Sequence, residues 1–100
     1  MKIEITVEFN KEWLAARQDN RSNPVRLLSY HLRRKNGIEI VEFKDNILKI
    51  AFLEKDISDA EVLNIIYDYM EKRYPQEDVR NIISVRVHNP DLEMKPIEMT

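Results

Sequence analysis

The chain of 100 residues contains no cysteine, a single glycine and only two histidines. Without cysteine, disulfide scaffolds, thiolate zinc sites and cysteine nucleophiles are excluded. The lone glycine, Gly37, excludes a glycine-rich loop that cradles phosphate groups. His31 and His88 fall on different predicted elements, with no second histidine at metal-binding spacing. We therefore expect a non-enzyme with neither a metal site nor a catalytic centre.

Long hydrophobic runs are also missing, since none approaches the ~20 residues that a membrane span needs. The N-terminal segment MKIEITVEF alternates apolar and polar residues and lacks the uninterrupted apolar core of a signal peptide. These features predict a cytoplasmic protein with no membrane partner and no small-molecule cofactor. We expect a single α+β domain over residues 1–90, followed by an extended or flexible tail over residues 91–100, where periodicity stops.

The most informative stretch is residues 38–53, IEIVEFKDNILKIAFL, in which a polar break separates two apolar-rich runs. This pattern predicts a β-hairpin with Asp45 and Asn46 in a type I′ turn, because both residue types tolerate positive φ. One face of the hairpin then carries the pairs Phe43–Leu48, Val41–Ile50 and Glu39–Phe52, and the other carries Glu42–Lys49, Ile40–Ala51 and Ile38–Leu53. A slip of one residue would exchange the two faces.

Two further strands are predicted by alternation. Residues 1–9 place Ile3, Ile5, Val7 and Phe9 on one side. Residues 79–87 place Ile83, Val85 and Val87 on one side and Ile82 on the other.

The helices are predicted by their capping residues. Asn10 suits the start of a helix over about 11–18, and Asn23 before Pro24 suits the start of one over about 24–35. Whether these form one kinked element or two is left open. Ser58 and Glu61 form a capping box for a helix that Pro75 ends.

The order strand, helix, strand, strand, helix, strand predicts an α+β fold. Its economical form is a four-stranded antiparallel sheet with two main helices on one face, the βαββαβ ferredoxin-like arrangement with strand order 4-1-3-2. Such a fold hosts many functions, so that function has to be sought in particular residues. The outer face of the first strand, where an RNA-recognition motif carries stacking aromatics, has only Lys2, Glu4, Thr6 and Glu8.

The strongest hint of a partner lies on the sheet face that the helices leave open. The residues predicted to form an apolar surface there are Ile38, Ile40, Ala51, Leu53 and Ile82. An uncovered sheet face should be polar, and apolar side chains on it are typical of an interface. We therefore expect a small protein-interaction module, of regulator or inhibitor type, that binds another protein chain as a dimer or a heteromer.

The alternative is a nucleic-acid-binding domain that uses the basic first helical region. Its candidate residues are Arg17, Arg21, Arg26, Arg33, Arg34 and Lys35. Across this stretch only Asp19 offsets the positive charge, and such a series suits contacts to phosphates. A solvated helix face explains the same residues without any ligand.

Overall fold

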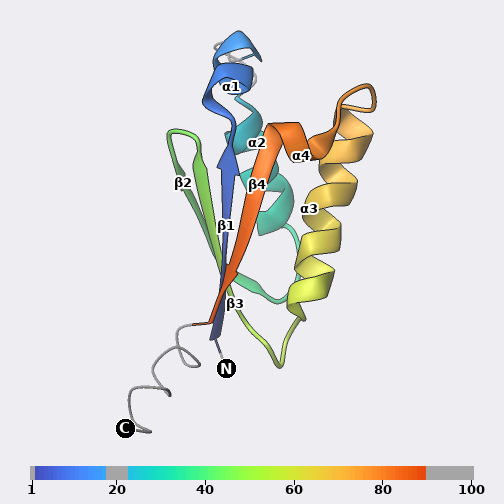
Figure 1. Cartoon of the computed structure of the whole chain (residues 1–100). Helices are drawn as coiled ribbons and strands as arrows, with labels where there is room; N and C mark the ends of the chain where they lie inside the picture. The colour runs from blue at the N-terminus through green and yellow to red at the C-terminus, as the bar shows by residue number, and fades with distance from the viewer. Residues whose placement is uncertain (1, 18–22, 90–100) are drawn as a thin grey trace, which may run out of the picture.

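The computed structural model describes residues 2–17 and 23–89, except for the side chain of Ile40. The predicted tail over residues 91–100 lies outside the described residues. The chain has an α+β fold (Figure 1). Its elements are β1 (Lys2–Phe9), α1 (Lys11–Arg17), α2 (Pro24–Arg33), β2 (Ile38–Lys44), β3 (Ile47–Leu53), α3 (Asp59–Arg73), α4 (Val79–Ile82) and β4 (Ile83–His88).

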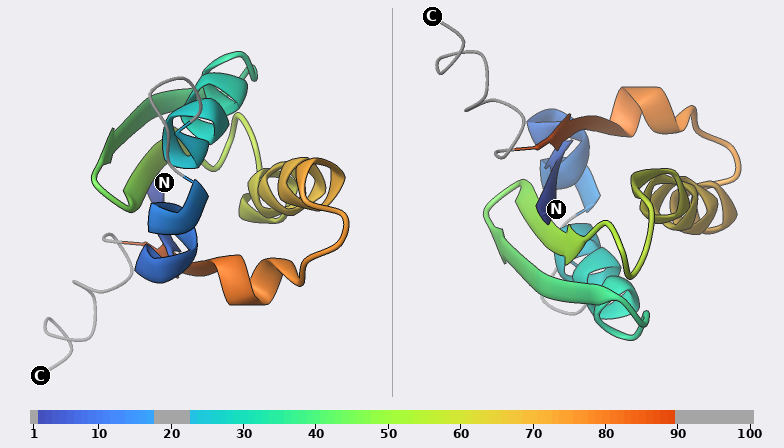
Figure 2. Two further views of the ribbon diagram at one scale, coloured as in Figure 1. Left: turned by 90° about the horizontal axis from the view of Figure 1, so that it is seen from above. Right: turned by 90° about the horizontal axis from the view of Figure 1, so that it is seen from below.

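The strands form one open antiparallel sheet in the order β2-β3-β1-β4, so that β2 and β4 are its edges. Seen along the strands, α2 and α3 lie on the same side of the curved sheet (Figure 2). A single core cluster fills the space between sheet and helices. It includes Ile5, Val7, Phe9, Leu48, Ile50 and Phe52 from the strands and Leu14, Leu28, Leu32, Val62, Ile66, Met70 and Ile82 from the helices.

The predicted helix starts are confirmed. The Asn10 side chain accepts a hydrogen bond from the amide of Trp13 at 2.9 Å, Asn23 accepts from Val25 at 3.0 Å, and Ser58 accepts from Glu61 at 3.1 Å. The described part of the region between β1 and β2 therefore holds two separate helices. None of the described helices is long and apolar enough to cross a membrane.

The hairpin turn differs from the predicted type I′. That type needs positive φ at both central residues, whereas only Asp45 has it, with φ of 56°. Asn46 is fixed instead by β1: its side-chain amide donates to the carbonyl of Phe9 at 2.9 Å, and its own carbonyl accepts from the Phe9 amide at 2.8 Å. Asn46 is only 7% exposed, so this contact ties the hairpin tip to the end of β1.

The predicted hairpin register is correct near the turn and wrong at the far end. Pairs from Phe43–Leu48 to Ile40–Ala51 form as predicted, but Ile38 lies opposite Phe52 and not Leu53. The irregularity falls at Glu39, where one extra residue in β2 shifts the alternation as a β-bulge does. Ile38 consequently packs against the core cluster on the helix side.

The last predicted strand is wrong over residues 79–82, which form the short helix α4. Asp78 caps it by accepting from the amide of Arg80 at 3.0 Å, so the local hydrogen bonding favours a helical turn over extended backbone. Ile82 is 1% exposed and belongs to the core. Of the four helical segments in the described residues, α4 is therefore the one that the sequence analysis did not predict.

Candidate interaction surfaces

The open face of the sheet, opposite the helices, carries an apolar column along the central strand β3. Alternation places Ile47, Lys49, Ala51 and Leu53 there, while Leu48, Ile50 and Phe52 enter the core. Ile47 and Leu53 are half-buried. Ala51 is 6% exposed, yet it does not belong to the core cluster on the helix side. The column therefore lies at the middle of the open face.

The structure brings together only part of the predicted interface. Ala51 and Leu53 lie on the open face, whereas Ile38 packs against the core and Ile82 is buried within it. Ile40 pairs with Ala51 through the backbone, and its side chain lies outside the described residues. Sequence reasoning missed Ile47, although its spacing from Lys49 and Leu53 was the signal that places it on this face.

Charged residues of both signs border the apolar side chains of the column, and the exposed Lys49 lies between Ile47 and Ala51 within it. Arg86 of β4 pairs with Glu8 of β1 at 3.8 Å, between Nη2 and Oε1. On the other side of β3, Glu42 and Lys44 of β2 lie opposite Lys49 and Ile47 in the register. The open face therefore combines apolar and charged side chains, as protein–protein interfaces do.

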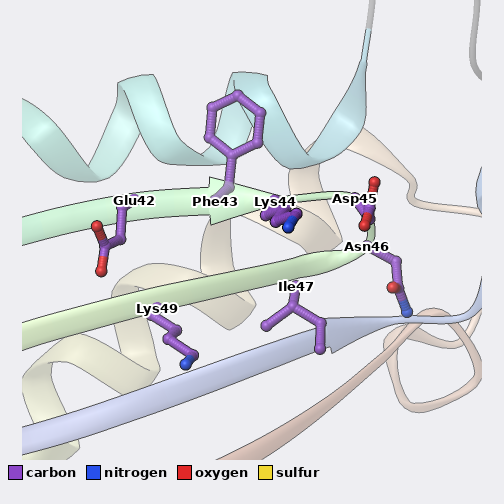
Figure 3. Close-up of a pocket in the computed structure, with 7 residues that line it drawn as sticks. All are labelled: Glu42, Phe43, Lys44, Asp45, Asn46, Ile47 and Lys49. Atoms are coloured by element: carbon purple, nitrogen blue, oxygen red, sulfur yellow. The ribbon is translucent and has the colours of Figure 1, made fainter.

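A hollow lies at the tip of the β2–β3 hairpin (Figure 3). Its lining residues are Glu42, Phe43, Lys44, Asp45, Asn46, Ile47 and Lys49. The Phe43 ring points to the opposite side from Glu42 and Lys49. Because a single hairpin supplies the whole lining and four of the seven side chains are charged, the hollow lacks the apolar enclosure of a small-molecule site.

The predicted basic series does not form one surface. Arg17 pairs with Glu77, which also accepts a hydrogen bond from the Trp13 indole at 3.1 Å. The Arg17 guanidinium lies 4.8 Å from the centre of the Trp13 ring, and Tyr74 meets the same ring edge-on at 5.0 Å. Arg17 therefore helps to hold α1 against the segment that follows α3. Arg21 lies outside the described residues.

The other basic residues lie on α2 or just after it. Arg26 and Arg33 gather around Tyr30, which is 40% exposed. Arg34 and Lys35 are exposed beyond the end of this helix. We call the side of α2 formed by Arg26, Tyr30 and Arg33 the basic flank. Sequence reasoning named both arginines but missed Tyr30, whose spacing of four and three residues from them was the available signal.

His31 is part of the packing between α2 and α3. Its ring stacks on Tyr69 with the ring centres 4.6 Å apart. Burial lowers the pKa of His31 from its ordinary value of 6.5, the positive charges of Lys35 and Arg34 lower it further, and Asp68 acts in the opposite direction. Burial likewise raises the pKa of Tyr69 above its ordinary value.

Among residues 2–17 and 23–89, no three histidine, aspartate or glutamate side chains are grouped as metal ligands would be. No protein-family model matches the sequence, and no curated protein or solved structure matches it significantly.

Proposed function

We propose that this chain is a small, non-enzymatic protein-interaction module of the ferredoxin-like type, and that its open sheet face binds a second copy of the chain. The observation that carries the proposal is the apolar column of Ile47, Ala51 and Leu53 on a face that packs against none of the described helices. Ile47 and Leu53 are partly exposed on this face, and apolar side chains stabilise an assembly when a partner removes them from water.

The ferredoxin-like arrangement is supported by the strand order β2-β3-β1-β4 and by antiparallel pairing between all neighbours. In this order β1 and β2 run in the same direction with β3 between them, and helices connect β1 to β2 and β3 to β4. The helical segments thereby gather on one side, which leaves the other side of the sheet available to a partner.

A second copy is supported by the mixed charges around the apolar column. The open face carries Lys44, Lys49 and Arg86 together with Glu8 and Glu42. When two identical faces meet about a two-fold axis, a residue of one copy lies opposite a different residue of the other copy, and the same pair forms again on the other side of the axis. A surface that carries both signs can then place lysine or arginine opposite glutamate, whereas a surface of one sign repels its copy.

Sedimentation or light scattering of the full chain tests the proposal. The molar mass should rise from monomer towards dimer as the concentration is raised from micromolar to millimolar. Leu53→Lys should keep the chain monomeric, because it replaces an apolar side chain at the end of the column, next to Ala51 on the same face, with a charged one.

Asn64→Lys is the matched control, since it adds the same charge at an exposed position of α3. It should dimerise like the parent chain. A parent chain that stays monomeric, or a Leu53→Lys variant that dimerises normally, contradicts the proposal.

A further inference from the structure

The basic flank of α2 lies beside the outer edge of β2. Val25, Leu28 and Leu32 form the buried side of this helix, and Arg26, Tyr30 and Arg33 recur four and three residues apart on an adjacent side. The helix packs chiefly over β2, an edge strand. Arg33 therefore reaches the strand itself, and its guanidinium donates to the main-chain carbonyl of Val41 at 3.0 Å from Nη2.

Two guanidinium groups are concentrated around one exposed ring on this flank. Their Cζ atoms lie 5.2 Å (Arg26) and 5.9 Å (Arg33) from the ring centre of Tyr30. The Nε of Arg26 donates to the Tyr30 hydroxyl at 2.7 Å. Within the described part of the chain, neither arginine forms an ion pair with a carboxylate, in contrast to Arg17 with Glu77. Two positive charges held close together without an acidic partner favour an anionic ligand.

The edge beside this flank has a main-chain group that suits an added strand. The outward backbone groups of an edge strand are the usual point of attachment for an extended peptide. At Val41 that place is taken by Arg33, so a peptide has to displace the guanidinium from the carbonyl. A carboxylate on the peptide supplies the compensating partner, because a guanidinium binds a carboxylate more strongly than a neutral carbonyl.

We infer that the outer edge of β2 and the basic flank together form a docking site for an extended acidic segment of a partner protein. The segment adds to β2 as a further strand and points two carboxylates towards Arg26 and Arg33. Arg33 then moves from the Val41 carbonyl to a carboxylate, and a main-chain N–H of the segment takes its place. Phe43, 36% exposed on the helix side of β2, supplies an apolar contact beside them.

Charge along β2 favours a peptide over a nucleic acid. Glu39 and Glu42 are exposed on this strand, and Glu42 lies on the open face. A continuous polyanion meets these carboxylates as well as the arginines. An extended peptide instead alternates its side chains, so that it presents carboxylates to the basic flank and neutral groups to the side of Glu42.

Fluorescence anisotropy with the full chain tests the inference. The probe is a short labelled peptide that alternates glutamate with threonine, compared with the same peptide carrying glutamine in place of glutamate and with a single-stranded oligonucleotide. The glutamate peptide should bind at least about tenfold more tightly than the glutamine peptide, and the double variant Arg26→Gln/Arg33→Gln should remove this difference.

Arg34→Gln/Lys35→Gln is the matched control, because it removes the same charge just beyond α2 and should leave binding nearly unchanged. Equal losses in both double variants, absence of peptide binding, or preferential binding of the oligonucleotide through Arg26 and Arg33 would overturn the inference. Leu53→Lys should retain peptide binding, since the edge site lies away from the open face. Failure of the edge site is thereby distinguished from failure of the dimer.

Discussion

The guanidinium of Arg33 donates to the main-chain carbonyl of Val41 through both Nη2, at 3.0 Å, and Nε, at 3.3 Å. This contact joins the outer side of α2 to an edge strand of the sheet. It occupies a carbonyl that would otherwise attract another strand, which is how native proteins protect sheet edges from unwanted pairing.

Replacing Arg33 with glutamine should change stability little. The side chain is exposed, and a hydrogen bond in that setting contributes at most about 1 kcal/mol. Urea denaturation of the variant should therefore give an unfolding free energy within about 1 kcal/mol of the parent chain. A loss of more than about 2 kcal/mol would show that the contact is needed to hold α2 on the sheet.

Replacing Asn46 should show how much its hydrogen bond to Phe9 of β1 stabilises the fold. Asn46→Ala should lower the unfolding free energy by about 1–2 kcal/mol, because the carbonyl of Phe9 loses a buried donor. Asn46→Asp should cost more at neutral pH, since an ionised carboxylate cannot donate and faces the carbonyl oxygen. Chemical denaturation of both variants provides the comparison, and an aspartate variant as stable as the parent chain would contradict it.

Replacing Ile82 should cost more stability than replacing Val87, which is the reverse of what the predicted strand implies. Ile82 is 1% exposed, so Ile82→Ala should cost about 2–5 kcal/mol. Val87 lies on the helix side of β4, opposite Ile5, but is 47% exposed, and Val87→Ala should cost less than about 1 kcal/mol. Thermal or urea unfolding measures both. Similar losses at the two positions would contradict the burial of Ile82 in α4.

Stability should fall on acidification through His31. Its pKa is lower in the folded chain than the unfolded value of 6.5, so the unfolded chain takes up the proton first. The contribution of neutral His31 to the free energy of unfolding is therefore fully present above pH 6.5, and it is lost as the pH falls towards the pKa of His31 in the folded chain.

His31→Phe keeps a ring against Tyr69 and cannot titrate. The pH dependence of the unfolding free energy between pH 7.5 and 5.5 should be weaker in this variant than in the parent chain. Identical slopes for the two proteins would exclude His31 as a source of that dependence.

The sequence predicted those features of the fold that depend on neighbouring residues. Asn10, Asn23 and Ser58 cap helices because each side chain bonds an amide two or three residues away. The register near the hairpin turn was predictable because the turn fixes the nearest pairs.

Features that depend on tertiary contacts were not predicted. The bulge at Glu39 has no glycine to mark it, and it alone moves Ile38 to the helix side. Residues 79–82, in contrast, do not alternate apolar and polar side chains, and the capping residue Asp78 was a local signal that a helical turn begins there. These two differences change the candidate interface, because Ile38 and Ile82 belong to the helix side of the sheet and not to the open face. The contact between Arg33 and the Val41 carbonyl depends on the packing of α2 over β2, which no spacing in the sequence shows.

Methyl NMR of the full chain over a range of concentrations tests the central claim most directly, because it reports on the two sides of the sheet separately. If the open face binds a second copy, the methyl resonances of Ile47, Ala51 and Leu53 shift together as the concentration rises, while those of the buried Ile50 and the exposed Val87 stay constant. If the three open-face resonances do not move, or if Val87 moves in their place, the open face is not the surface through which this protein associates.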